Sequence, residues 1–380
     1  MRTAIKVEEI SKEMCERLLS DLEKARRPVL KALKTTLDNT KYDHKVGYLT
    51  PAGKMVATEL NVSSVKKMSR AIFILEIMLR NVETGGVNTK REIYYMAKGE
   101  VKHNSSLRPL DFQDQDESDS VIDFICELLE CYREDMNCYA NDRGGQTYSQ
   151  QLVVTETMPD GTKAEVDLSS LGTTPFQPRN RPQALKLKAK KKIDFCVIVE
   201  SEGTANTLQA NGFTKRNPCI LMGAQGVPSN AVRGWAKLIQ DQLRIPMYFF
   251  GDLDAYTLQN IFRTLKAGSA ASLLRNSDFS APDVKFLGVL PTDIKKWDLP
   301  DYAVKEHDVQ EARALKKAVD ALGNDPFFKD KRNKGLSAIL HWLVENKRRC
   351  EQQAYFSVNP RDPQMPEKII IEKIKKGDYV

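Results

Sequence analysis

The second half of the chain alternates short apolar runs with helical segments, and this alternation constrains the fold more than any other feature. Four runs predict buried strands: Ile193 to Val199, Cys219 to Met222, Ile245 to Phe250 and Val284 to Leu290. Helical patterns separate them, one of which is capped by Ser229 or Asn230 and runs to about Arg244. Strands that alternate with helices predict an α/β fold with a parallel sheet.

Acidic residues follow two of these strands directly. Glu200 comes after the first strand, and Asp252 and Asp254 come after the third. Because ligands bind beyond the carboxyl ends of parallel strands, the three carboxylates converge if the two strands are neighbours. Carboxylate oxygens suit Mg²⁺ better than zinc. The pattern therefore predicts a magnesium site, whereas an Asp-x-Asp pair by itself is more often only a solvated surface feature.

A short helix in the first half carries a second constellation. Thr89 and Glu92 have the spacing of a capping box, so a helix is expected to begin there. Arg91 and Tyr95 are four residues apart and share one face of that helix. A guanidinium is always charged and suited to gripping a phosphate, so it could assist a tyrosine that attacks a phosphodiester. The plainer interpretation is a pair of half-buried packing tyrosines, Tyr94 and Tyr95.

The segments around this helix suggest a DNA-binding domain. Helices are predicted from Ser64 to Asn81, with Met68, Ile72, Leu75 and Leu79 on one face, and from about Ser118 to Asn137. A hairpin follows, with strand Gln151 to Thr155 and a turn at Pro159 to Thr162. Three helices and a hairpin are the ingredients of a winged helix. Helix-turn-helix proteins that bind DNA without cutting it are the main alternative.

A length of 380 residues favours two domains, and the composition fits a soluble globular protein. We expect an N-terminal extension over residues 1–62, whose helix would run from Glu8 to Leu37. A winged-helix domain would then occupy 63–165, a linker 166–190 and a parallel-sheet domain 191–380, with a largely helical C-terminal part. The longest apolar run, Ala71 to Leu79, is too short to span a membrane.

The net charge and the cysteines of the chain indicate what kind of partner it binds and in which cellular compartment it works. The formal net charge of +7 fits a polyanionic partner such as DNA. Lys188 and Lys190 lie in the basic run at 185–192 and are candidates for DNA-backbone contact, although a solvated linker or strand edge explains the run equally well. Residues 1–9 show no apolar signal core, and the seven cysteines form no C-x-x-C pair. We therefore expect no secretory leader, disulfide framework or structural zinc.

The two constellations together resemble a known family. Val199-Glu200-Ser201 and Asp252-Leu253-Asp254 resemble the two signatures of a Toprim domain. Lys90 to Tyr95 resembles the active-site tyrosine motif of the meiotic double-strand-break transesterase and of the topoisomerase VI A subunit. Further similarity covers Arg143-Gly144, the loop from Gly223 to Pro228, Gly268-Ser269 and Ala281 to Gly288. The resemblance runs in the same order from about residue 60 to the C-terminus.

This resemblance implies a mechanism and its residues. A winged-helix, CAP-like domain would precede a Toprim domain. Tyr95 would be the nucleophile that forms a 5′-phosphotyrosyl bond, assisted by Arg91. Mg²⁺ would be held by Glu200, Asp252 and Asp254, and DNA would be contacted by Arg143, Gly223 and Gly226. One departure is Ala255-Tyr256, where the family usually has a proline after the second aspartate.

The resemblance also implies partners. Double-stranded DNA would be cut by a homodimer in which each tyrosine faces the other protomer's metal. The chain has no G-x-x-x-x-G-K-[ST] loop, which is the usual ATP-binding motif. The resemblance therefore implies that a topoisomerase VI B-type subunit hydrolyses the ATP, in an A2B2 heterotetramer. Residues 1–62 are the candidate docking segment for that subunit. Such a protein would be intracellular and DNA-associated. The alternatives are a meiotic-type transesterase without strand passage and a non-catalytic DNA-binding homologue.

Overall fold

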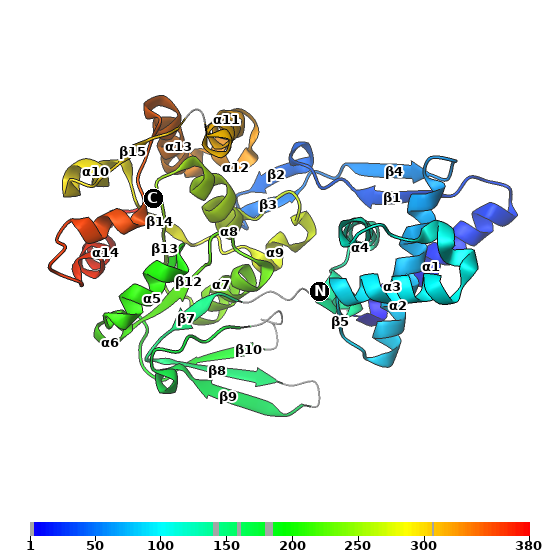
Figure 1. Cartoon of the computed structure of the whole chain (residues 1–380), viewed down its shortest axis with the longest axis horizontal. Helices are drawn as coiled ribbons and strands as arrows, with labels where there is room; N and C mark the ends of the chain where they lie inside the picture. Colours follow the sequence, from blue (N-terminus) through cyan, green and yellow to red (C-terminus); the bar gives the residue numbers. More distant parts are fainter. Residues whose placement is uncertain (1–3, 140–143, 158–160, 179–184, 306–307) are drawn as a thin grey trace. The chain divides into compact units, whose positions relative to one another are not determined.

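A computed structural model describes residues 4–139, 144–157, 161–178, 185–305 and 308–380. The chain forms two compact units (Figure 1). The first, called here the helical unit, comprises Met1–Thr40, Pro51–Asn141 and Ala270–Arg275. The second, called the sheet unit, comprises Lys41–Thr50, Asp142–Ser269 and Asn276–Val380. Each unit is described by itself below.

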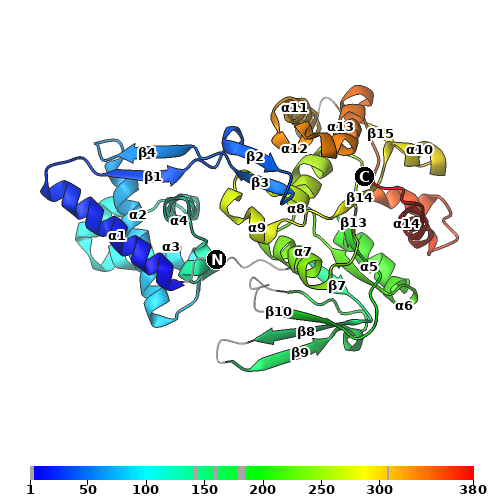
Figure 2. The ribbon, with the colours of Figure 1, turned by 180° about the vertical axis from the view of Figure 1, so that it is seen from behind.

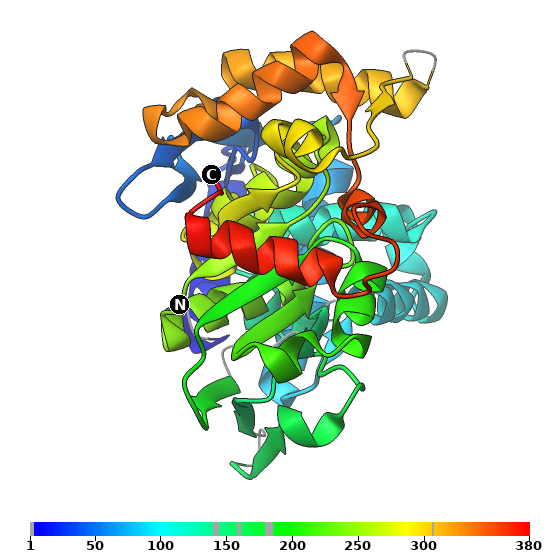
Figure 3. The same ribbon diagram turned by 90° about the vertical axis from the view of Figure 1, so that its left-hand side faces the viewer.

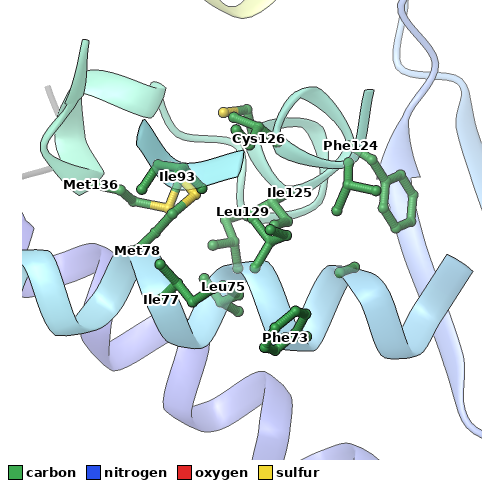
Figure 4. Close-up of a cluster of buried hydrophobic side chains, with 14 of the residues drawn as sticks. Phe73, Leu75, Ile77, Met78, Ile93, Phe124, Ile125, Cys126, Leu129 and Met136 are labelled. Atoms are coloured by element: carbon green, nitrogen blue, oxygen red, sulfur yellow. The ribbon is translucent and has the colours of Figure 1, made fainter. Parts of the chain in front are cut away.

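The helical unit is built on four helices and two short strand pairs. The helices are α1 (Ala4–Glu23), α2 (Val65–Thr84), α3 (Lys90–His103) and α4 (Gln115–Leu129). The strand β1 (Val29–Leu33) pairs antiparallel with β4 (Met55–Glu59), and β5 (Asn88–Thr89) pairs parallel with β6 (Cys138–Tyr139). Apolar side chains from α2, α3 and α4 meet in one core, which includes Leu75, Met78, Ile93, Ile125 and Leu129 (Figure 4).

Several sequence expectations for this unit need correction. The helix expected from Glu8 to Leu37 ends at Glu23, because Ala25 adopts a left-handed φ of 52° that stops the helix, and the residues after Pro28 pair as β1. The third helix ends at Leu129, where Glu130 adopts a left-handed φ of 49°. Ser64 precedes α2 but makes no side-chain cap, and Ile72 is 41% exposed rather than part of the buried face.

The expected hairpin is present, but it belongs to the sheet unit. Strand β8 (Leu152–Thr157) pairs with β9 (Lys163–Asp167) and also with β10 (Leu185–Ala189), so that β8 is the centre of a three-stranded antiparallel sheet (Figure 2). Part of the expected linker is therefore a strand. The ribbon that does belong to the helical unit is β1–β4, whose strand β1 contacts α4. The winged-helix arrangement stays a prediction.

All four strands expected in the second half are present, and they form one sheet. The order is β14-β13-β11-β12-β7, in which β11 (Phe195–Val199), β12 (Cys219–Gly223), β13 (Met247–Phe250) and β14 (Lys285–Gly288) are parallel. The edge strand β7 (Gln146–Tyr148) is antiparallel to β12. The central strand β11 is buried along its whole length, as expected for a parallel sheet covered on both faces.

Helices and short ladders surround this sheet. The helices are α5 (Glu202–Ala210), α6 (Phe213–Arg216), α7 (Asn230–Leu243), α8 (Arg263–Ala267), α9 (Asn276–Phe279), α10 (Pro291–Trp297), α11 (Val309–Asn324), α12 (Pro326–Lys329), α13 (Lys334–Asn346) and α14 (Met365–Lys376). Helix α14 contacts the edge strand β14 (Figure 3). The remaining pair is β15 (Tyr302–Ala303) with β16 (Arg348–Arg349).

The division into units differs from the expected domain ranges. The hairpin of β2 (Thr40–Asp43) and β3 (Tyr48–Pro51) lies in the expected N-terminal extension, yet residues 41–50 group with the sheet unit. Its contacts explain the grouping: Asn276 Nδ2 donates to the Leu49 carbonyl at 3.0 Å, and Arg332 donates to the His44 carbonyl at 3.0 Å. These partners are more than two hundred residues away in the chain, so no local pattern predicts them.

A buried ion pair fixes the C-terminal part of the sheet unit. Lys373 Nζ of α14 lies 2.7 Å from both carboxylate oxygens of Asp293, and neither side chain is exposed. The Tyr355 hydroxyl donates to the same carboxylate at 2.6 Å. Because both charges are paired and hydrogen-bonded, their burial is tolerated, and the network joins α14, α10 and the segment around Tyr355.

Candidate active site

The helix expected at Thr89 is present with its complete capping box. The Glu92 N–H donates to Thr89 Oγ1 at 3.3 Å, and the Thr89 N–H donates to the Glu92 carboxylate at 2.6 Å. The buried face of α3 is Ile93, Ala97 and Val101. The cap therefore fixes where the helix begins, and this start determines which side chains face outward.

Tyr95 is on the outward face. It is 58% exposed, whereas Tyr94 is partly buried and packs against the core of the helical unit. The two rings meet edge to face with centroids 5.2 Å apart. Of the two adjacent phenols, the geometry thus presents Tyr95 to an external substrate.

Arg91 is exposed one turn before Tyr95. Within the described ranges, neither its guanidinium nor the Tyr95 hydroxyl has a hydrogen-bonding partner. Its basic neighbours differ: Lys90 Nζ lies 3.2 Å from Asp123, and Lys98 Nζ lies 2.9 Å from Asp111. Acidic residues between 111 and 123 therefore pair with these lysines, and Arg91 remains available for an anion.

In the sheet unit, the two strands that carry the acidic residues are direct neighbours. Strand β11 pairs parallel with β13, with Val199 opposite Phe250. The Glu200 N–H donates to the Phe250 carbonyl at 2.9 Å, and the Asp252 N–H donates to Glu200 Oε2 at 3.0 Å. The two strands are thus neighbours and Glu200 contacts the Asp252 backbone, whereas a shared metal-binding role of Glu200, Asp252 and Asp254 stays a prediction.

Two residues that the sequence analysis missed hold these carboxylates. Thr257 is fully buried, and its hydroxyl lies 3.0 and 3.1 Å from the two Glu200 carboxylate oxygens. Its backbone N–H donates to Asp254 Oδ1 at 2.6 Å. The Gln352 N–H donates to Asp252 Oδ1 at 2.8 Å. The Asp-x-x-Thr spacing of a helix start is a local signal for Thr257, whereas Gln352 is a hundred residues away and has none.

Burial makes the ionised carboxylates costly. It raises the pKa of Glu200 to about 8, with further raising by the charges of Asp252 and Asp254. Burial also raises the pKa of Asp252 to about 6, and the charge of Asp254 adds to this. The pKa of Asp254 is raised as well, again mainly by burial. A bound divalent cation would offset this cost, because it favours the ionised forms.

The donor set fits a hard cation, although the side chains do not form a ready-made cage. In the part of the chain that the structure describes, no group of three or more His, Cys, Asp or Glu side chains stands in a metal-holding arrangement. The carboxylates of Glu200 and Asp254 instead accept hydrogen bonds from Thr257. Mg²⁺ keeps several waters and needs only one or two carboxylates, so such a cage is not required.

Comparisons with known proteins cover both constellations. The family model of the Toprim domain shared by the topoisomerase 6 A subunit with Spo11 matches residues 195–369, and the model described as "Type IIB DNA topoisomerase" matches 66–138. The A subunit of type 2 DNA topoisomerase 6 from Methanocaldococcus jannaschii is 31% identical over 346 residues, which cover 90% of this chain and 88% of the relative. The chain belongs to the type IIB DNA topoisomerase family.

Two further relatives are similar over most of this chain. The corresponding A subunit from Aeropyrum pernix is 27% identical over 92% of this chain and 86% of the relative. The A subunit of DNA topoisomerase 6 from Arabidopsis thaliana is 28% identical over 78% of this chain and 64% of the relative. The type IIB match includes Arg91 and Tyr95, and the Toprim match includes all three carboxylates. A Toprim domain is in general a metal-binding domain.

The departure from the usual topoisomerase pattern at Ala255 has a structural explanation. Asp254 stands at the start of a helical segment, because its carboxylate accepts from the Thr257 N–H and its carbonyl accepts from the Leu258 N–H at 3.3 Å. Ala255 therefore occupies the first helical position. Proline is favoured there because its fixed φ suits the helix start, but alanine also fits. Alanine at this position is compatible with the hydrogen bond from the Thr257 N–H to the Asp254 carboxylate.

The glycine loop lies beside the carboxylates. The Ala224 N–H donates to the Val199 carbonyl at 2.8 Å, and the Gly226 N–H donates to the Glu200 carbonyl at 3.0 Å. Gly226 has a φ of +76°, which favours glycine, and it is partly exposed. Gly223 is buried at the end of β12, so it packs inside the domain rather than presenting itself to DNA. Arg143 lies outside the described residues.

Of the two candidate lysines, Lys188 lies on the edge strand β10 and Lys190 directly follows it, and their surroundings differ. Lys190 Nζ pairs with the Asp167 carboxylate and donates to Ser169 Oγ at 2.8 Å. Lys188 is exposed and has no ion-pair partner among the residues that the structure describes. Lys188 is thus the better placed of the two for a phosphate, and contact with DNA remains a prediction for both.

Proposed function

We propose that this chain is the DNA-cleaving subunit of a type IIB topoisomerase and that it breaks both strands through a 5′-phosphotyrosyl intermediate. One observation carries the proposal. A chain of this family presents an exposed tyrosine one helical turn from an arginine that has no partner among the described residues, and it also gathers three carboxylates at the ends of adjacent Toprim strands. A protein that only bound DNA would need neither arrangement.

In the proposed reaction, the Tyr95 phenolic oxygen attacks a backbone phosphorus. A phosphorus–oxygen bond forms to the tyrosine, the bond to the 3′-oxygen breaks, and the phenol loses its proton while the 3′-oxygen gains one. The number of phosphodiester bonds is unchanged, so the reverse attack reseals the strand without another reactant. Arg91 binds the phosphate oxygens by charge-assisted hydrogen bonds.

Glu200, Asp252 and Asp254 would hold the metal, which we propose to be Mg²⁺. When bound, the ion supplies positive charge where negative charge develops on the phosphate. The protein's own part is positional: Thr257 orients the carboxylates of Glu200 and Asp254, and Gln352 orients Asp252. Such support matters because small errors in the placement of charged groups weaken their effect on the transition state.

Double-stranded DNA is the proposed substrate and a homodimer the proposed unit, in which each Tyr95 serves the other protomer's carboxylates. The relatives are named as A subunits, and this chain lacks a Walker-type phosphate loop. We therefore infer a B-type ATPase partner in an A2B2 assembly, docked through residues 1–62. Within the described ranges, no helix is long and apolar enough to cross a membrane. Action on DNA would place the protein inside the cell.

Trapping the covalent intermediate tests the proposal. Incubation with supercoiled DNA and Mg²⁺, followed by denaturation, should leave protein attached to 5′ DNA ends. Tyr95→Phe must abolish the adduct, whereas the matched variant Tyr94→Phe must keep it. An adduct that persists in Tyr95→Phe would assign the nucleophile to another residue. Adding a B-type subunit with ATP then separates strand passage from breakage alone, which distinguishes a topoisomerase from a break-forming transesterase.

A further inference from the structure

Gln352 is packed directly against the Asp-x-Asp segment. It is 1% exposed, and its backbone N–H donates to Asp252 Oδ1 at 2.8 Å. The Gln352 side-chain amide also lowers the pKa of the Asp252 carboxyl. Two residues before it, Cys350 forms a two-way backbone bridge with Leu253, with N–O distances of 2.8 and 3.2 Å. These contacts fix Gln352 beside the metal-site carboxylate.

The oxygen of the Gln352 side-chain amide is unsatisfied. Gln352 Oε1 is fully buried and has no hydrogen-bonding partner among the residues that the structure describes. Buried polar atoms in native proteins are nearly always paired, so an orphaned oxygen beside a carboxylate indicates a missing partner.

The chemistry of the surroundings points to a cation as that partner. The backbone N–H of Gln352 donates to Asp252, so the side chain is attached directly beside this carboxylate. Asp252 in turn contacts Glu200, and amide oxygens are ordinary ligands for hard divalent cations. A neutral ligand completes the coordination of an ion without adding to the repulsion among the carboxylates.

We propose that Gln352 is part of the metal site: its backbone N–H holds Asp252, and its Oε1 is a ligand of the divalent cation. The inference rests on the metal site of the proposed function and deepens it. It adds a donor from the segment that follows β16, far from the two Toprim signatures in the sequence. It also assigns a purpose to a buried oxygen that otherwise only costs stability.

Calorimetric titration of Mg²⁺, and of Mn²⁺ as a second probe, into the metal-free full chain tests this. Gln352→Met keeps the volume but removes both amide ends, and it should weaken binding about tenfold or more. Gln352→Glu keeps an oxygen ligand and should bind Mg²⁺ at least as well as the wild type. Gln209→Met is the matched control, because Gln209 is a buried glutamine that bonds Thr214 instead, and its binding should be unchanged.

The outcomes separate the different failures. Equal affinity in the wild type and Gln352→Met would overturn the inference and leave the proposed function intact. Equal weakening in Gln352→Met and Gln352→Glu would show that the amide only positions Asp252, and the ligand role would be lost. A wild-type chain that binds neither ion would overturn the metal site of the proposed function itself. The melting temperature of each metal-free variant is measured alongside, so that a folding defect is recognised.

Discussion

Replacing Glu200 by glutamine should make the metal-free sheet unit more stable at alkaline pH. The pKa of Glu200 is about 8 in the folded protein, against a usual value of 4.5. Between these two values the folded state holds a proton that the unfolded state has lost. The contribution of Glu200 to the folding stability is therefore full below pH 4.5 and falls as the pH rises towards 8. The neutral amide of Glu200→Gln would resemble the protonated acid at every pH, so the variant lacks this decline.

The size of the effect follows from the span of the shift. Each unit of difference in pKa corresponds to about 1.4 kcal/mol. Between about pH 5 and about pH 8.5, the Glu200 shift corresponds to on the order of 4 kcal/mol of lost stability. This is a large part of the free energy of unfolding of a typical domain. The buried carboxylates thus lower the stability of the metal-free protein, while they keep a site that suits a cation.

Urea unfolding in the presence of a chelator measures this, with tryptophan fluorescence as the signal. The three tryptophans, Trp235, Trp297 and Trp342, all lie in the sheet unit, so the signal reports that unit. The wild type should lose stability with rising pH relative to Glu200→Gln. The control Glu165→Gln, at an exposed position of β9, should follow the wild type. Parallel pH profiles for wild type and Glu200→Gln would refute the reasoning, as would a Mg²⁺-induced stabilisation that is equal in both.

Three further predictions concern residues outside the signature motifs. Thr257→Val removes the hydroxyl that orients Glu200, so calorimetry should show Mg²⁺ affinity reduced about tenfold, and an unchanged affinity would contradict the positioning role. Lys373→Met leaves Asp293 as an unpaired buried charge and should cost about 3 to 5 kcal/mol in urea unfolding near neutral pH, whereas a loss well under 1 kcal/mol would show that the pair is dispensable. Lys188→Ala should reduce the slope of log affinity for DNA against log salt concentration by about 1. Lys190→Ala should reduce it by less, because Lys190 is already paired with Asp167. DNA-binding titrations at several salt concentrations measure both slopes, and a larger reduction in Lys190→Ala would contradict the prediction.

The ion pairs of helix α3 affect which of its basic side chains is available to bind a phosphate. Acidic residues between 111 and 123 pair with Lys90 and Lys98, the basic neighbours of Arg91 on the same helix. Without those pairs, three cations would compete for one phosphate. With them, Arg91 is the side chain of α3 that best combines exposure, permanent charge and the correct spacing from Tyr95. The acidic residues Asp111 and Asp123 thus act as partners of these two lysines.

The sequence by itself determined the local features of this protein. Apolar runs of strand length, separated by helical patterns, were enough to locate β11, β12, β13 and β14, because burial on both faces requires unbroken apolar strands. The capping box fixed the start of α3, and the four-residue spacing fixed Arg91 and Tyr95 on one face. Each of these depends on interactions within a few residues, which a sequence displays directly. Where a local signal was weaker, as between α1 and β1, the helical pattern was extended too far.

Only the tertiary structure decided which distant segments meet. The adjacency of β11 and β13 turned three separate acidic residues into one cluster, and a segment a hundred residues later brought Gln352 to Asp252. The same holds for β2 and β3, which join the sheet unit, and for β10, which completes a sheet with the hairpin. These neighbours are selected by packing among side chains far apart in the chain, because closing a long loop costs little more than closing a short one. A local sequence pattern therefore locates each strand or helix, but it does not show which distant segment each one packs against.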